Sequence, residues 1–115
     1  MSDEIEPGWF SENLHPILKR HLRELQKRMG FVLTVTSGYR HPDHNIDVGG
    51  VEDSEHTYDP AEGVDILCKR SVTRFKMVKE ALDMGIVRIG IGKDFIHLGI
   101  AEDKPKQVMW TYYGE

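Results

Sequence analysis

Apolar side chains recur at steps of three and four residues between Leu14 and Met29, and charged side chains fill most positions between them. This spacing places the apolar groups on one face of a helix, so the segment predicts an amphipathic helix packed on a core. Asn13 can cap the start of this helix, Ser11 is an equally good candidate, and Gly30 suits its end.

Further along the chain, β-branched and aromatic residues dominate five short runs, which predict strands. A second helix is predicted from Ser71, as its cap, to just before Gly85. Its inward face is expected to carry Val72, Phe75, Val78 and Leu82. The predicted strands are residues 31–36, 64–68, 87–91, 95–100 and 108–113.

The order of these elements predicts an α+β fold, in which a small antiparallel sheet is packed with helices on one side. Residues 37–63 separate the first two strands and show no sustained periodicity. A loop this long inside a compact domain is usually functional. A length of 115 residues fits one domain, so we expect residues 1–115 to form a single domain.

The composition excludes several classes of function. Fifteen Lys and Arg against nineteen Asp and Glu give a net charge of −4, which offers no basic footprint for nucleic acid or for an anionic membrane. Cys68 is the only cysteine, so an intramolecular disulfide and a thiolate zinc cluster are both excluded. Any metal must therefore be bound by His and carboxylate side chains.

The amino-terminal segment is acidic and lacks the basic flank and apolar run of a signal peptide. No stretch of about 18 apolar residues, the length that a membrane span requires, occurs in the chain. We therefore expect a protein that is cytoplasmic as synthesised.

His56, Asp65 and His97 are the strongest candidates for chemistry. His56 lies in the long loop, Asp65 lies at the start of the next predicted strand, and His97 lies on a neighbouring one, so the three can converge. Two imidazoles and one carboxylate would leave the fourth position of a tetrahedral zinc open to water, as in catalytic sites. The spacing is equally compatible with Asp65 as a turn cap and His97 as a buried sheet residue. His41 and His44 form a weaker candidate pair.

Several short motifs occur together in one order. They are SGYR (37–40), NIDVGG (45–50), SEH (54–56), GVDI (63–66), RIGI (88–91), DFIHL (94–98) and WTY (110–112). In this order and approximate spacing the chain resembles the family of zinc D-Ala-D-Ala carboxypeptidases and L-alanyl-D-glutamate endopeptidases, over roughly two-thirds of its length. The amino-terminal signalling domain of hedgehog shares that fold, so the resemblance implies a hedgehog-like fold.

Position by position, the resemblance implies that His56, Asp65 and His97 are zinc ligands. It also implies that Asp94 is the general base or acid, and that Arg40 stabilises developing negative charge or binds a substrate carboxylate. Zinc lowers the pKa of bound water to about 7, a carboxylate accepts its proton, and a guanidinium pairs with an oxyanion. Asp94 can face the metal with His97 only if residues 92–94 form a turn.

Two positions depart from the usual pattern of that family. Its Asp ligand usually stands seven positions after the first His, whereas Asp65 stands nine positions after His56. Asp59 and Glu62 are therefore alternative ligands, although Asp65 is favoured because it lies on a predicted strand rather than in a turn. Gly99 stands where the family often has an Asp that can support the last His.

The resemblance implies a zinc-dependent peptidase that hydrolyses the peptide stems of peptidoglycan, as a D,D-carboxypeptidase or as an L-alanyl-D-glutamate endopeptidase. The small size favours a phage or prophage lysis enzyme of the endolysin type, which acts on the cell wall once released. We expect a monomer whose partner is a peptidoglycan peptide, with no nucleic acid or membrane partner. The alternative is a non-enzymatic zinc-binding structural or recognition module of the same fold.

Overall fold

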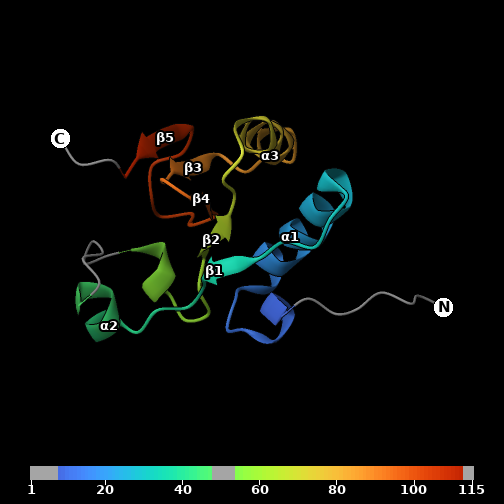
Figure 1. Ribbon diagram of the computed structural model, residues 1–115. Coiled ribbons are helices and arrows are strands. Elements are labelled where there is room, and N and C mark those ends of the chain that lie inside the picture. The colour runs from blue at the N-terminus through green and yellow to red at the C-terminus, as the bar shows by residue number, and fades with distance from the viewer. Residues whose placement is uncertain (1–7, 48–53, 113–115) are drawn as a thin grey trace.

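The computed structural model describes residues 8–47 and 54–112, and Figure 1 shows their arrangement. In this part of the chain two longer helices, α1 (Pro16–Met29) and α3 (Ser71–Asp83), accompany a five-stranded sheet. A short helix α2 (Pro42–Asp47) and two 3-10 turns, η1 (Gly8–Ser11) and η2 (Glu55–Thr57), complete the helical elements. The strands are β1 (Val35–Ser37), β2 (Gly63–Leu67), β3 (Arg88–Ile91), β4 (Phe95–Gly99) and β5 (Val108–Thr111).

The sheet has the strand order β1-β2-β4-β3-β5. The pairs β1–β2, β2–β4 and β3–β4 are antiparallel. β5 lies on the far side of β3 from β4 and runs parallel to β3, because the connection after β4 passes the end of β3 before β5 begins. The predicted α+β class is confirmed, and the expected fully antiparallel sheet is corrected at the β3–β5 pair.

The two faces of the sheet carry different side chains. Residues alternate between the faces along a strand, so Val64 and Ile66 on β2 point to the face opposite Asp65, and His97 on β4 pairs with Asp65. Helices α1 and α3 cover the apolar face of the sheet, as predicted (Figure 1). Asp65 and His97 lie on the other face. The core between helices and sheet includes Leu18, Leu22, Leu25, Val64, Ile66, Met77, Ala81, Ile96 and Leu98.

Helix α1 begins after His15 and ends at Gly30. The His15 Nδ1 atom accepts a hydrogen bond from the Ile17 N–H at 3.1 Å, so His15 caps the helix, and not Asn13 or Ser11. An imidazole lone pair satisfies the same unpaired N–H that a Ser or Asn oxygen usually satisfies. Gly30 adopts a φ of 83° at the C-cap, as the sequence predicted.

The first strand is shorter than the sequence predicts. β1 covers Val35–Ser37 instead of residues 31–36, because the Leu33 N–H donates to the side-chain oxygen of Gln26 at 3.0 Å instead of to a neighbouring strand. The other strands lie close to their predicted bounds. The long loop from 37 to 63 contains α2 and η2, which its irregular pattern did not indicate.

The inward face of helix α3 includes Val78 from the predicted face, but not the other three residues. Val72, Phe75 and Leu82 are 78%, 64% and 48% exposed, whereas Met77 and Ala81 are fully buried. The sequence offers two apolar rows on this helix, and periodicity cannot choose between them. Met77 and Ala81 form the row that packs on the core.

Candidate metal centre

His56 is held by hydrogen bonds to its backbone and to its ring. The Ser54 hydroxyl accepts from the His56 N–H at 3.1 Å, and the Arg40 N–H donates to the His56 carbonyl at 2.7 Å. The ring Nδ1 donates to the Gly38 carbonyl at 2.8 Å, because a carbonyl oxygen can only accept. In the neutral ring, Nε2 therefore carries the lone pair, and it lies 3.1 Å from Asp65 Oδ1.

Asp65 and His97 meet because β2 and β4 pair in register. The two residues are directly opposite each other in the antiparallel ladder, which brings their side chains together on one face of the sheet. His97 Nδ1 lies 2.9 Å from the same Oδ1 atom of Asp65. All three side chains of the group, His56, Asp65 and His97, are buried.

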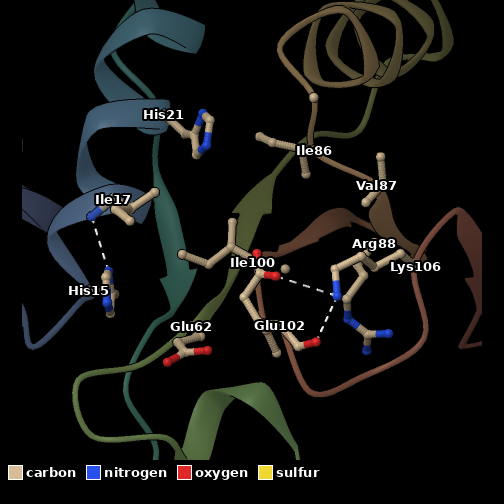
Figure 2. Close-up of a pocket in the computed structure, with 13 residues that line it drawn as sticks. His15, Ile17, His21, Glu62, Ile86, Val87, Arg88, Ile100, Glu102 and Lys106 are labelled. Carbon is tan, nitrogen blue, oxygen red and sulfur yellow. Dashed lines mark hydrogen bonds and ion pairs between the residues drawn. The ribbon is translucent and has the colours of Figure 1, made fainter.

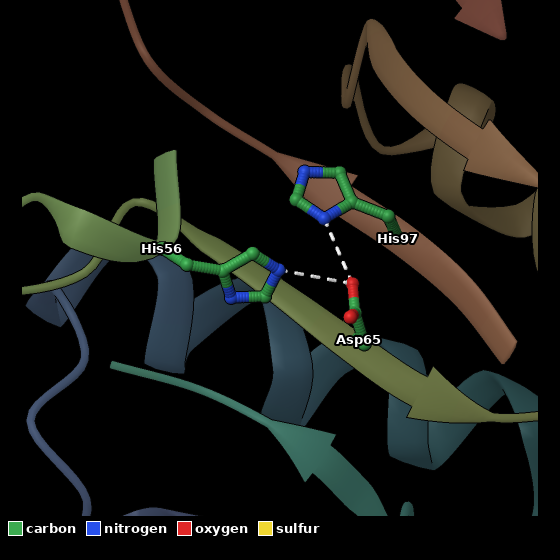
Figure 3. Close-up of side chains that lie close together, drawn as sticks. All are labelled: His56, Asp65 and His97. Atoms are coloured by element: carbon green, nitrogen blue, oxygen red, sulfur yellow. Dashed lines mark hydrogen bonds and ion pairs between the residues drawn. The ribbon is translucent and has the colours of Figure 1, made fainter. Parts of the chain in front are cut away.

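The arrangement of these three side chains fits a metal ion. Their ligand atoms all lie within 4.8 Å of one another, and both rings and the carboxylate point to a common place (Figure 3). Ligands of a tetrahedral zinc at 2.0–2.1 Å are separated by about 3.4 Å, close to the separations of 2.9 and 3.1 Å seen here. Two His and one Asp leave a fourth coordination position for water or substrate, as catalytic zinc sites do.

The carboxylates at this site are held in their charged form. Burial alone would raise the pKa of Asp65, but its contacts with the rings of His56 and His97 outweigh that effect and lower the pKa to about 2. The pKa of Glu55 is also lowered to about 2, because hydrogen bonds from His97 and Arg88 outweigh its burial. Against the opposing effect of burial, contacts with Asp65 and Glu55 raise the pKa of His97. An ionised Asp65 is the form that binds a metal.

The three side chains open onto a cleft of about 730 Å³, which Arg40 also lines. The Arg40 Nη2 atom lies 3.9 Å from Asp65 Oδ2 and donates to Ser37 Oγ at 2.8 Å. The structure thus brings Arg40 next to the three candidate ligands. A guanidinium in this place can pair with a carboxylate or an oxyanion in the cleft.

Aromatic side chains form one wall of the cleft. The rings of Trp110 and Tyr112 lie 5.5 and 6.5 Å from the His97 ring, measured between centroids. Gly90 on β3 provides the space for them, since a Cβ at this position would lie 2.7 Å from Tyr112 and 2.8 Å from Trp110. An apolar wall beside a few polar groups is typical of sites that bind small ligands.

Asp94 lies in the turn between β3 and β4, and its side chain is exposed. The Gly92 N–H donates to the Phe95 carbonyl at 2.9 Å and closes the turn. Residues 92–94 therefore form the turn that the proposed role of Asp94 requires. Asp94 is not among the side chains that line the cleft, so the structure does not bring it to the three candidate ligands as it brings Arg40.

The other candidate ligands lie elsewhere. Asp59 is exposed and accepts from the Asn13 side-chain amide at 2.7 Å. Glu62 lines a separate cavity of about 190 Å³ beside the first turns of α1 (Figure 2). His41 and His44 are exposed. Within residues 8–47 and 54–112, none of these four belongs to the group that meets at His97.

Glu55 and Arg88 form an ion pair beside His97, and the sequence did not indicate this contact. The Glu55 carboxylate accepts from His97 Nε2 at 2.9 Å. The Arg88 Nε and Nη2 atoms donate to Glu55 at 2.9 and 3.2 Å. The SEH motif places Glu55 beside a candidate ligand, but only the fold brings it to the second His.

The comparison with protein families identifies one match. A family model described as Peptidase M15 matches residues 1–99. The search of curated proteins returned no match. In the part of the chain that the structure describes, no helix combines the length and the apolar character needed to cross a membrane.

Proposed function

The chain belongs to the peptidase M15 family, and from this premise we propose that it is a zinc-dependent peptidase that hydrolyses the peptide stems of peptidoglycan. Family membership indicates a metallopeptidase. The observation that carries the proposal for this chain is the convergence of His56 Nε2, Asp65 Oδ1 and His97 Nδ1. This is a donor set that zinc prefers and that leaves one position open.

His56, Asp65 and His97 would hold the ion. Zinc bound there would act as a Lewis acid and lower the pKa of its water to about 7. Arg40, which lies beside Asp65 in the cleft, would stabilise negative charge that develops on the carbonyl oxygen of the substrate. The buried position of the three ligands keeps their side chains in place for this role.

Hydrolysis of a peptide bond adds one water across the C–N bond, and one proton moves from the water to the leaving nitrogen. We assign this proton transfer to Asp94, whose carboxylate is exposed on the turn that leads into His97. Glu55 is unsuited to it, because its two oxygens already accept hydrogen bonds from His97, Arg88 and the Ala101 N–H.

The cleft suits an acidic peptide with small side chains. Arg40 and Lys104 both line it, and these cations can pair with the carboxylates of a stem peptide. Trp110 and Tyr112 offer an apolar surface for the methyl groups of alanine. These features support a D,D-carboxypeptidase and an L-alanyl-D-glutamate endopeptidase equally.

The test is to incubate the zinc-saturated protein with purified murein and with synthetic stem peptides, and to identify the products by mass spectrometry. Release of D-Ala identifies a carboxypeptidase, and a new amino terminus at D-Glu identifies the endopeptidase. Activity should be lost on chelation and restored by zinc, and His97→Ala should be inactive. Murein that is bound but not cleaved would contradict the proposal and favour a non-enzymatic recognition module.

A further inference from the structure

Glu55 is buried at the centre of a hydrogen-bond network that reaches the candidate metal ligands. Its side chain is only 2% exposed. Oε1 accepts from His97 Nε2 at 2.9 Å and from Arg88 Nη2 at 3.2 Å. Oε2 accepts from Arg88 Nε at 2.9 Å and from the Ala101 N–H at 3.0 Å. Both oxygens therefore have two donors each.

The absence of a side chain at Gly99 leaves space for the Glu55 carboxylate. Gly99 follows His97 by two residues on β4, so a side chain at position 99 would extend to the same face. A Cβ added there would collide with both carboxylate oxygens of Glu55. The presence of Glu55 beside His97 therefore depends on glycine at position 99.

From this geometry we propose that Glu55 is a positioning residue, which fixes the proton of His97 on Nε2 and so presents Nδ1 to the metal. An ionised carboxylate can only accept a hydrogen bond, so the nitrogen that faces it must donate. In the ring that binds the metal, Nδ1 then carries the lone pair, and it is the atom beside Asp65. Gly38 acts in the same way on His56. Partners of this kind fix the ring orientation and tautomer of metal-binding His residues.

The Glu55→Gln variant separates this role from simple space-filling. Both partners of Oε2, Arg88 Nε–H and the Ala101 N–H, can only donate. Oε1 has one such partner, Arg88 Nη2, and its other partner is His97, whose proton can move to the other ring nitrogen. The amide oxygen is therefore expected to take the place of Oε2. The amide NH₂ group then faces His97 Nε2 and donates to it, which moves the His97 proton to Nδ1. The variant keeps the shape of the side chain but blocks the nitrogen that should bind the metal.

The experiment measures zinc affinity by competition with a chromophoric chelator, in the wild type, Glu55→Gln, Gly99→Ala and the double variant. We expect each single variant to bind zinc about 10- to 100-fold more weakly. The double variant should lose little more than either single variant, because both changes remove the same contact. Met77→Ala, in the core beneath α3, is the control for general destabilisation and should keep wild-type zinc affinity.

A second readout follows the ring proton itself. In the zinc-saturated wild type, NMR should show a slowly exchanging His97 Nε2–H signal that is shifted downfield by its carboxylate acceptor. This signal should move upfield or disappear in Glu55→Gln. The inference is overturned if Glu55→Gln and Gly99→Ala bind zinc within about twofold of the wild type, or if Met77→Ala weakens binding as much as they do.

This inference rests on the proposed zinc site, and the two can fail separately. A wild-type protein that binds no zinc would overturn both. A wild type that binds zinc and cleaves stem peptides, with variants at position 55 that bind zinc equally well, would overturn only the role of Glu55.

Discussion

The hydrogen-bond partners of the two His rings determine which ring nitrogen carries the proton. The Gly38 carbonyl and the Glu55 carboxylate accept from the outer nitrogens of His56 and His97. The inner nitrogens of both rings therefore face Asp65. Under the proposed metal site, residues that do not contact the metal would therefore affect how tightly it binds.

Asp94→Asn tests the assignment of the proton carrier. The amide keeps the shape of the side chain but cannot accept a proton, so turnover on a stem peptide should fall about 10²- to 10⁴-fold. Zinc stoichiometry and the free energy of unfolding should stay close to the wild type, because Asn is also common in turns. Turnover is measured in steady state on the zinc-saturated variant.

The control for this variant is Asp83→Asn, which changes an exposed carboxylate at the end of α3. It should leave turnover unchanged. If Asp94→Asn turns over as fast as this control, Asp94 is only a turn residue and the base lies elsewhere.

Each of the three candidate ligands stands in a recognisable motif, and the structure brings their side chains together. The path of the loop between His56 and Asp65 was not predictable. Asp65 reaches the site although the loop after His56 is longer than usual. The extra residues of this loop are held by hydrogen bonds to other parts of the chain. Tyr58 donates to Asp103 at 2.9 Å, and Asp59 accepts from Asn13 at 2.7 Å. These partners lie far apart in sequence, so no local pattern indicates them.

Among the elements, α3 shows most clearly where periodicity fails. Of the four residues that were predicted to face inward, Val72, Phe75 and Leu82 lie at the surface and Val78 packs against the core. By contrast, α1 has one wide apolar face, and its predicted position and its end at Gly30 were correct. The sequence pattern shows which face of a helix packs on the core only when the helix has a single apolar face. Contacts with the rest of the core decide the other cases.

Met77→Ala and Phe75→Ala form a matched pair on α3. Met77 is fully buried and Phe75 is 64% exposed. Met77→Ala should therefore lower the free energy of unfolding by about 2–5 kcal/mol, whereas Phe75→Ala should lower it by about 1 kcal/mol or less. Urea denaturation of the two variants measures both values. An equal or larger loss for Phe75→Ala would mean that the helix packs through its other face.

For the molecule as a whole, the sheet separates the apolar core from the candidate site. Helices α1 and α3 cover one face of the sheet (Figure 1). That face holds the apolar core, and the opposite face holds Asp65, His97 and the cleft. Alternation along β2 and β4 makes this division possible, since neighbouring residues on one strand serve opposite faces. The α+β class followed from the order of the elements. The parallel pairing of β5 did not, because the connection after β4 has no pattern that fixes its route.

The most direct test of the whole account is the position of the metal in a crystal of the zinc-loaded protein, located by anomalous diffraction at the zinc absorption edge. The account predicts one strong peak between His56 Nε2, an Asp65 carboxylate oxygen and His97 Nδ1, with Zn–N distances of about 2.0–2.1 Å. A peak at His41 and His44 instead, or a zinc ion bound without His97, would contradict it.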